Sequence, residues 1–155
     1  MYRKLLIAVD PEDDGEGKVA LETACQLVEE SGELHLASIY QPGSAGFFPH
    51  VESETPEEKE AEVRKWLDLL MRKYLPMNRS ASLHVVAGTP GEALVALAAS
   101  TGVDLLLLVS RGSSSHWPLR KATVEYVSVN APCAILILPP IPREEREEQA
   151  EAKQS

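Results

Sequence analysis

The sequence that decides the fold reads Asp104-Leu-Leu-Leu-Leu-Val-Ser-Arg-Gly112-Ser-Ser-Ser-His-Trp117 and continues, after a short interval, with Ala131-Pro-Cys-Ala-Ile-Leu-Ile-Leu-Pro139. Both stretches contain a continuous apolar run, which is typical of a strand buried on both faces. Between the two runs, a glycine turn with three serines leads into a predicted helix that Pro118 can open. A strand followed by a glycine turn and a helix start can direct backbone N–H groups at a phosphate.

The remainder of the chain alternates in the same way between apolar runs and segments with helical periodicity. Strands are predicted over residues 5–9, 34–40, 82–87, 104–109 and 133–138, and helices over residues 18–31, 55–74, 90–100 and 118–129. This alternation predicts an α/β fold, with an open five-stranded parallel sheet and helices on both faces. Ligands of such folds bind beyond the carboxyl ends of the strands, here near residues 9–10, 39–40 and 109–112.

Short local signals set the expected helix ends. Thr55-Pro-Glu-Glu58 and Thr89-Pro-Gly-Glu92 both have the form of a capping box with Pro at the first helical position. Gly32 and Gly102 are natural stops for the first and third helices. The second helix is expected to pack through one face, formed by Val63, Trp66, Leu67, Leu70, Met71 and Tyr74. The stretch Gln41–Glu54 has no usable period and is expected to be a loop.

The composition indicates one acidic domain with an aliphatic core. The chain has 155 residues, of which 44% are hydrophobic and only 5% aromatic, and its formal net charge is −9. This balance argues against nucleic-acid binding, which requires clustered Lys and Arg. No apolar run approaches the roughly 18–20 residues that span a membrane. We therefore expect a cytoplasmic protein with one domain over residues 1–140 and a charged, disordered tail over residues 141–155.

The remaining reactive residue types give no sign of catalysis. Cys25 and Cys133 lie in apolar patterns without metal-ligand spacing, so we expect both to be free thiols in the core and expect no metal site. His116 has no partner at the spacing of a catalytic triad, so no catalytic residue is predicted. Trp66 and Trp117 are interpreted as packing residues rather than as stacking platforms for a ligand.

A set of motifs, in order along the chain, resembles the universal stress protein family. These motifs are Leu6-Ile-Ala-Val-Asp10, Gly88-Thr-Pro-Gly-Glu92, Val103-Asp-Leu-Leu-Leu-Leu, Ser110-Arg-Gly112 and Ala131-Pro-Cys-Ala-Ile-Leu-Ile-Leu. Each motif alone is weak, but the ordered set covers nearly all of residues 1–140. The resemblance implies a Rossmann-like fold similar to that of adenine-nucleotide hydrolases, with the strand order 3-2-1-4-5.

The family has an ATP-binding branch, whose phosphate pattern is Gly-x2-Gly-x9-Gly-Ser/Thr. Asp10 matches the aspartate after the first strand, which meets the adenine and ribose region; a turn or N-cap carboxylate is the alternative interpretation. Gly112 matches the second glycine, but Val109 and Ala122 stand where glycines are expected. An alternative register places Lys121-Ala122 at the last glycine pair, and both outer glycines are missing in either register. Val109 adds bulk where the backbone should approach phosphate, and Ala122 restricts a position that can need a positive φ. The candidate, degenerate nucleotide site comprises Asp10, Ile39, Val109, Arg111, Gly112, Ser113, Ala122 and Thr123.

The other branch, which includes the founding type of the family, lacks the phosphate pattern and is not thought to hold ATP. Ser113-Ser-Ser-His-Trp117-Pro-Leu-Arg-Lys121 is more similar to that branch. The resemblance therefore implies a non-enzymatic stress-response protein, with no cofactor favoured and ATP as the alternative ligand. A slow ATP hydrolase remains the enzymatic alternative. A phosphorylatable receiver domain is rejected, because Val86-Ala-Gly88 and Pro139-Pro140 stand where its acceptor Asp and its Lys are required.

The last strand is expected to join two copies of the chain. Ala134-Ile-Leu-Ile-Leu138 is apolar on both faces, and the implied strand order places it at a sheet edge. Long apolar edges are covered or paired in natural proteins, and the family commonly dimerises there. We expect a homodimer through Ala134–Leu138, and a further protein partner is left open.

Overall fold

The computed structural model describes residues 1–10, 13–41, 55–110 and 118–140. The predicted loop from residue 42 onward, the serine turn over residues 111–117 and the charged tail over residues 141–155 lie outside the described residues.

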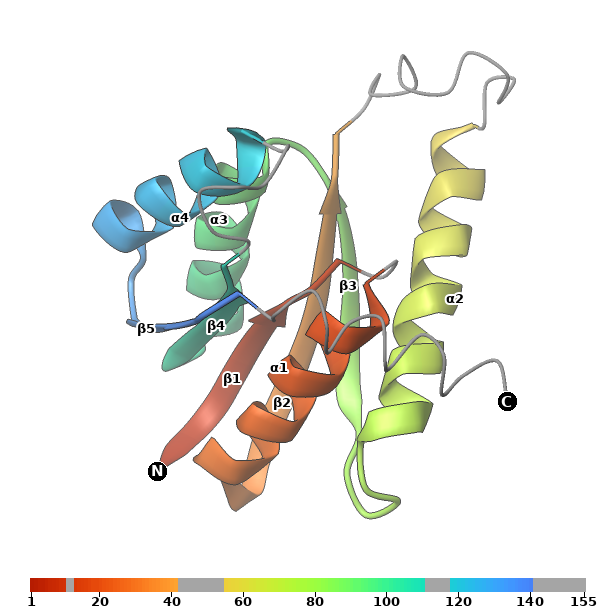
Figure 1. The fold of residues 1–155 in the computed structure, drawn as a ribbon, viewed down its shortest axis with the longest axis vertical. Coiled ribbons are helices and arrows are strands. Elements are labelled where there is room, and N and C mark those ends of the chain that lie inside the picture. The colour runs from red at the N-terminus through yellow and green to blue at the C-terminus, as the bar shows by residue number, and fades with distance from the viewer. Residues whose placement is uncertain (11–12, 42–54, 111–117, 141–155) are drawn as a thin grey trace.

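The described part of the chain forms one parallel sheet with helices on both faces (Figure 1). All pairings between its strands are parallel, and the strand order is β3-β2-β1-β4-β5. Both the predicted fold class and the predicted order are confirmed. The elements are β1 (Tyr2–Ala8), α1 (Asp14–Leu27), β2 (Val28–Tyr40), α2 (Pro56–Tyr74), β3 (Ala81–Ala87), α3 (Pro90–Thr101), β4 (Leu105–Val109), α4 (Pro118–Asn130) and β5 (Ala134–Leu138).

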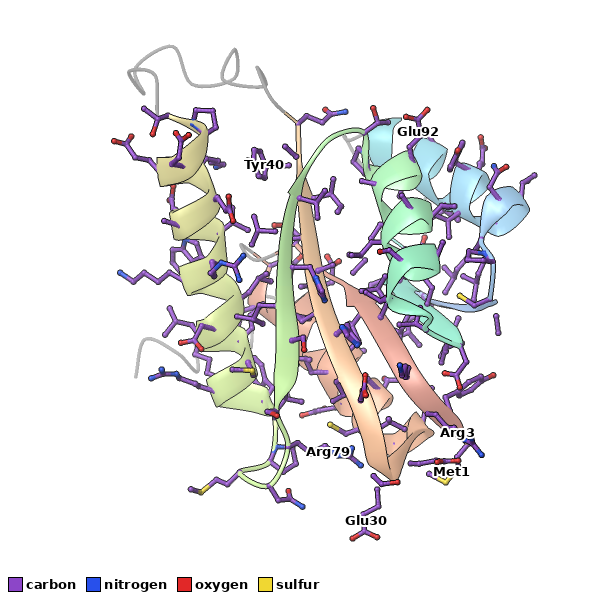
Figure 2. The ribbon with its side chains drawn as sticks, turned by 180° about the vertical axis from the view of Figure 1, so that it is seen from behind. Met1, Arg3, Glu30, Tyr40, Arg79 and Glu92 are labelled. Atoms are coloured by element: carbon purple, nitrogen blue, oxygen red, sulfur yellow. The ribbon has the colours of Figure 1, made fainter. Side chains whose placement is uncertain are left out.

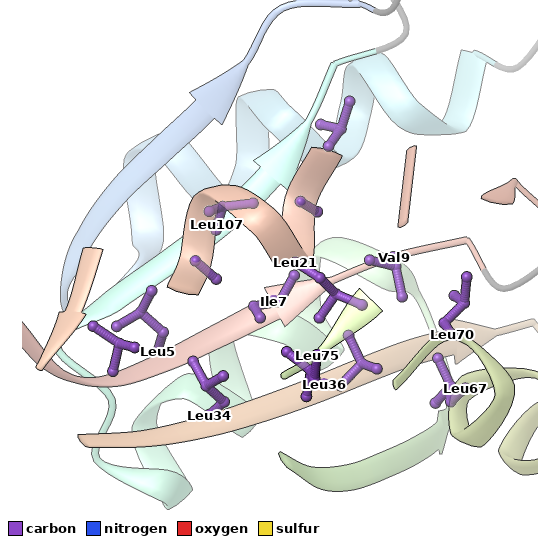
Figure 3. Packing of buried hydrophobic residues seen from close by; sticks show 14 of the residues in the cluster. Leu5, Ile7, Val9, Leu21, Leu34, Leu36, Leu67, Leu70, Leu75 and Leu107 are labelled. Atoms are coloured by element: carbon purple, nitrogen blue, oxygen red, sulfur yellow. The ribbon is translucent and has the colours of Figure 1, made fainter. Parts of the chain in front are cut away.

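Two apolar layers hold the helices to the sheet. Alternate residues of each strand point to opposite faces, so Leu105 and Leu107 join the cluster under α1 and α2, whereas Leu106 and Leu108 join the cluster under α3 and α4. Figure 3 shows the first cluster, in which Leu21 of α1 and Leu67 of α2 pack on the sheet. Every residue of β4 is buried, as its continuous apolar sequence predicts.

The predicted bounds of the first helix are wrong at both ends. α1 begins at Asp14, because the Asp13 side chain accepts a hydrogen bond from the Glu16 N–H at 3.0 Å and caps the helix. It ends at Leu27, because the chain enters β2 at Val28. Gly32 therefore lies inside a strand and does not end the helix. A Cβ at Gly32 would come within 2.8 Å of the Arg3 carbonyl oxygen, so close strand packing explains this glycine.

The second and third helices start at their predicted prolines, but only one of the two capping boxes forms. The Thr55 hydroxyl accepts from the Glu58 N–H, and the Glu58 carboxylate accepts from the Thr55 N–H, both at 3.2 Å. Thr89 makes no side-chain capping bond. Its carbonyl accepts the Ala93 N–H at 2.9 Å, a bond that needs no particular side chain. Gly102 ends α3 as predicted, in a left-handed conformation with φ of 67°.

Side-chain burial follows the predicted pattern with one exception. Val63, Leu67 and Leu70 of α2 are buried, but Trp66 is 44% exposed because it lies at the border of the apolar stripe. Cys25 and Cys133 are free thiols that pack against the two clusters, as predicted. Burial raises the pKa of both thiols, which keeps them protonated at neutral pH.

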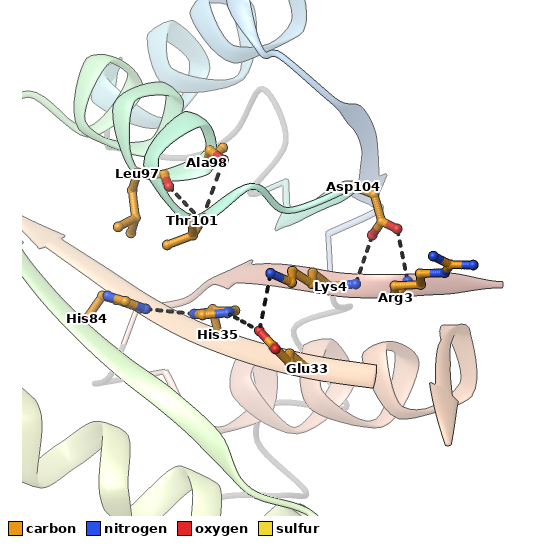
Figure 4. A network of polar contacts seen from close by, with 9 residues as sticks. All are labelled: Arg3, Lys4, Glu33, His35, His84, Leu97, Ala98, Thr101 and Asp104. Carbon is orange, nitrogen blue, oxygen red and sulfur yellow. Dashed lines mark hydrogen bonds and ion pairs between the residues drawn. The ribbon is translucent and has the colours of Figure 1, made fainter. Parts of the chain in front are cut away.

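Asp104 ties the start of β4 to the start of β1 (Figure 4). Its carboxylate accepts the backbone N–H groups of Arg3 and Lys4 at 2.9 and 3.0 Å, and its own N–H donates to the Lys4 carbonyl at 2.9 Å. Desolvation alone would raise the pKa of Asp104, but the hydrogen bonds to its charged form outweigh it and hold this pKa below the ordinary value.

Replacing Asp104 with Asn should lower the free energy of unfolding by about 1 kcal/mol at pH 7, because one of the two charge-assisted acceptors is lost at an exposed site. A depressed folded-state pKa stabilises the fold above the unfolded pKa of about 3.9 and ceases to do so as pH falls through the folded value. The difference in unfolding free energy between variant and wild type, measured by urea denaturation, should therefore shrink below about pH 4.

Asp68→Asn is the matched control, because Asp68 makes only an exposed ion pair with Arg72 at 2.9 Å on the surface of α2. We expect it to change stability by less than about 0.5 kcal/mol. Equal losses in the two variants would contradict a role for Asp104 in joining the strands.

Candidate functional site

The carboxyl ends of the strands gather the residues that the sequence predicts for a site. β2, β1 and β4 are neighbours in the sheet, and parallel strands end at the same edge. Ile39 lies near the end of β2, Asp10 follows β1 and Val109 is the last residue of β4. The topology thus brings these three residues to one edge. Arg111, Gly112 and Ser113 lie outside the described residues.

Asp10 is not the N-cap of α1. That role belongs to Asp13, whose carboxylate accepts the Glu16 N–H, while the Asp10 main-chain carbonyl accepts the Asp13 N–H at 3.1 Å. The turn therefore uses the Asp10 backbone. The half-buried Asp10 side chain lies at the edge where ligands of this fold class bind.

Val109 occupies a core position. It is only 3% exposed and belongs to the apolar cluster under α1 and α2, together with Leu107. The next residue, Ser110, donates its N–H to the Leu138 carbonyl at 2.9 Å, so the strand pairing continues to the start of the turn. A valine at this position fills with methyl groups the space that a glycine would leave open.

The ends of β2 and β3 are joined beside Ile39. Gly88 donates its N–H to the Tyr40 carbonyl at 2.9 Å and has a φ of 153°, a conformation that side chains disfavour. Ile39 itself is partly buried and packs against the cluster under α3 and α4. The carboxyl ends of β2 and β3 therefore present backbone and apolar groups beside Ile39.

Ala122 and Thr123 lie inside α4, where Ala122 is exposed and Thr123 is half-buried. Residue 122 does not have a positive φ in this structure, because none of the described non-glycine residues does. The helix already extends over this position, and alanine is its most favourable residue.

Acidic residues near the start of α1 serve the fold. Asp14 accepts hydrogen bonds from the Tyr74 hydroxyl and from Lys73 Nζ, the latter at 3.1 Å, and so ties α1 to α2. Burial, and then the hydrogen bond to Asp14, raise the pKa of Tyr74 well above its ordinary value. In the described ranges, no three His, Cys, Asp or Glu side chains converge in a way that could hold a metal ion.

A shallow depression of about 410 Å³ lies away from this edge and is lined by Arg3, Lys4, Glu29, Ser31, Gly32 and Glu33. Figure 2 shows Tyr40 and Glu92 at one end of the molecule and Arg3 and Glu30 at the other. Residues that line the depression form ion pairs, at 3.9 Å between Arg3 and Glu29 and at 3.8 Å between Lys4 and Glu33. It is not part of the candidate site.

Two features of the structure have no local signal in the sequence. Glu16 is fully buried in the first turn of α1, where an acidic residue is ordinarily interpreted as an exposed partner of the helix dipole. His35 and His84 contact each other across β2 and β3, although they stand 49 residues apart in the sequence. Only the register between the two strands brings these histidines together.

The fold is an open α/β sheet with its candidate site at the carboxyl edge, which is the ligand-binding edge of this class. The family model of the Universal stress protein family matches residues 1–139. The chain therefore belongs to the universal stress protein family. A search of curated proteins found no match to the sequence.

Solved structures share the fold at low sequence identity. The chain matches hypothetical protein MJ0577 with a TM-score of 0.72 and 19% identity, over 92% of this chain and 99% of that one. It matches a universal stress protein in complex with cAMP with a TM-score of 0.56 and 19% identity, over 88% and 96% of the two chains. It matches UspA from Lactobacillus plantarum with a TM-score of 0.56 and 19% identity, over 88% and 97%. In the described part of this chain, no helix is both long and apolar enough to cross a bilayer.

Replacing Val109 with glycine should lower the stability of the fold. Val109→Gly removes a buried side chain and loosens a strand, so we expect the free energy of unfolding to fall by about 2–4 kcal/mol. Ala122→Gly, at an exposed helical position, should cost only about 1 kcal/mol. Urea denaturation of both single variants measures the difference. A Val109→Gly variant as stable as the wild type would show that this side chain is not part of the core.

Proposed function

We propose that this chain is a non-enzymatic regulatory member of the universal stress protein family, with a nucleotide site that binds ATP weakly or not at all. The resemblance of its turn to the non-ATP-binding branch supports this proposal. The observation that carries it is the burial of Val109 in the core cluster, at the position of the first glycine of the phosphate pattern. An apolar side chain there limits the approach of backbone N–H groups to a phosphate.

The contacts of the acidic residues near this edge support the proposal that the protein does not catalyse phosphoryl transfer. Asp13 caps α1 and Asp14 holds Tyr74 and Lys73, so both carboxylates already stabilise the fold. Catalysis of phosphoryl transfer depends mainly on positioned charges and Mg²⁺. Carboxylates that already make these contacts are poor candidates for binding Mg²⁺.

A nucleotide-dependent switch with weak ATPase activity is the second candidate. One relative of the same fold was solved in complex with cAMP, and Asp10 stands at the position of the family's adenine and ribose contact in this chain. Under this alternative, the adenine and ribose would supply most of the affinity, and the phosphates would remain loosely held.

Calorimetric titration of the full chain with ATP and Mg²⁺ should give a dissociation constant above roughly 100 μM, which corresponds to a binding free energy weaker than about −5.5 kcal/mol. Phosphate release should not exceed that of a protein-free control. Low-micromolar affinity for the wild type would overturn the proposal.

The double variant Val109→Gly with Ala122→Gly should bind ATP at least about tenfold more tightly, a gain of about 1.4 kcal/mol. The matched control is Val109→Ala with Ala122→Gly, which removes the two methyl groups but keeps the Cβ; we expect a smaller gain. Circular dichroism at the titration temperature must show both variants folded, because the glycine at residue 109 weakens the core.

We further propose that two copies of the chain pair through β5. β5 is an edge strand, and Ile137 on it is 37% exposed. The N–H and C=O of one residue in a strand point to the same side, and successive residues alternate. The Leu138 carbonyl points toward β4, where it accepts the Ser110 N–H. The N–H and C=O of Ile137 therefore face the open edge of the sheet. The backbone of a second copy can accept a hydrogen bond from this N–H and donate one to this C=O.

Light scattering at tens of micromolar should report a dimer, and Ile137→Pro should shift it toward monomer, because proline removes an outward-facing donor. Ile137→Thr is the matched control: it keeps the donor and the β-branched shape and should weaken the dimer less. A wild-type monomer at this concentration would contradict the pairing.

A further inference from the structure

Two histidines on neighbouring strands form a close pair on the α3 side of the sheet (Figure 4). In the register of β2 and β3, His35 lies opposite Ser82, and His84 lies opposite Ala37, so the histidines are diagonal neighbours on one face. His35 Nδ1 lies 2.9 Å from His84 Nε2, the ring centroids are 5.1 Å apart and the ring planes differ by 25°. This geometry is that of a hydrogen bond between two imidazoles.

The neighbours of the pair determine which nitrogen donates. Glu33 Oε2 lies 3.4 Å from His35 Nε2, so the carboxylate favours a proton on that nitrogen. His35 Nδ1 is then an acceptor, and His84 Nε2 donates to it. One proton on each ring satisfies both contacts.

The charges around the pair come from four elements. Glu33 of β2 also lies 3.8 Å from Lys4 Nζ of β1. Arg64 of α2 reaches the edge of the sheet, where it bonds to the Leu83 carbonyl at 3.4 Å and to Glu60 at 3.3 Å. α3 packs on β2 and carries its single charged residue, Glu92, in its first turn. The cations from β1 and α2 oppose any further positive charge on the pair.

The pair can accept one additional proton without losing its hydrogen bond, because the charged ring can donate the N–H that faces the other ring while the neutral ring accepts it. A second additional proton would place N–H groups on both facing nitrogens at 2.9 Å and would break the bond. Burial, the charge of His35 and the charge of Arg64 all lower the pKa of His84.

We propose that His35 and His84 form a pH-sensitive latch, which holds the edge strand β3 to β2 at neutral pH and releases it when both imidazoles become charged. Among the strands that the structure describes, β2 alone pairs with β3, so loss of this contact weakens the attachment of β3 directly. The effect can extend to the carboxyl edge, because Gly88, four residues after His84, bonds to Tyr40. The latch does not depend on whether nucleotide binds.

The sign of the pH dependence follows from proton counts. In the unfolded chain each histidine takes up a proton near pH 6.5. The folded chain takes up the first proton but resists the second, so the unfolded chain binds more protons below that pH. Stability from the latch is therefore complete above about pH 7 and declines as pH falls through 6.5 toward the folded value.

Proton NMR of the full-length wild type tests the proposal without any variant. Titration should show His84 protonating below the ordinary pH for histidine, because burial and the charge of the neighbouring ring oppose its protonation. In His35→Gln, His84 should titrate at a higher pH than in the wild type. Two independent titrations near pH 6.5, unaffected by the replacement of either histidine, would overturn the latch.

Hydrogen exchange locates the effect on β3. After correction for intrinsic rates, the amides of Ala81–Ala87 should exchange about tenfold faster at pH 5.5 than at pH 7, relative to those of β1, because one extra proton changes the equilibrium about tenfold per pH unit. This excess should vanish in His84→Gln and persist in His50→Gln, a control outside the pair. A uniform change over both strands, or no change, would contradict the proposal.

Discussion

Burial of the central strands on both faces is the constraint on which the rest of the structure depends. Leu5–Ile7 of β1 and Leu105–Val109 of β4 are buried between the two helical layers. Strands enclosed in this way have no room for polar side chains, because each would need a partner in the core. Polar side chains are therefore excluded from these buried stretches of β1 and β4. Asp104, which joins the two central strands, lies where β4 begins.

The two edges of the sheet are protected differently. β3 has α2 beside it, Arg64 on its outward Leu83 carbonyl, and the histidine pair that ties it to β2. The outward backbone groups of β5 lie next to partly exposed apolar side chains, such as Ile137. A charged side chain on a strand edge discourages pairing with another chain, whereas an exposed apolar edge invites it. This difference explains why we place a second copy at β5 and a conformational response at β3.

The sheet could be predicted from the sequence because its signals are local: five apolar runs, their alternation with helices, and a set of family motifs. The predictions that were wrong concern residues whose roles are set by contacts with distant parts of the chain. Gly32 fits a helix stop in sequence, but the nearby Arg3 carbonyl accounts for it. Of the candidate site, the edge positions of Asp10, Ile39 and Val109 follow from strand ends alone. The burial of Val109 and the contact of His35 with His84 could not be predicted, because both depend on packing and register between distant segments.

These observations separate two kinds of chemistry within one family fold. At the carboxyl edge, the described side chains serve packing and capping: Val109 fills the core, Asp13 caps α1 and Asp14 joins α1 to α2. The titratable network Lys4–Glu33–His35–His84 instead lies on the strands, away from that edge. A protein that responds to its surroundings needs an element with two states of similar free energy and a group that biases them. In this chain β3 is an edge strand that pairs with β2, and the histidine pair between them is the group that a change in proton concentration can reach. The proposed regulatory role is therefore compatible with the proposed weak nucleotide site, because the proposed histidine latch lies on a different part of the same sheet.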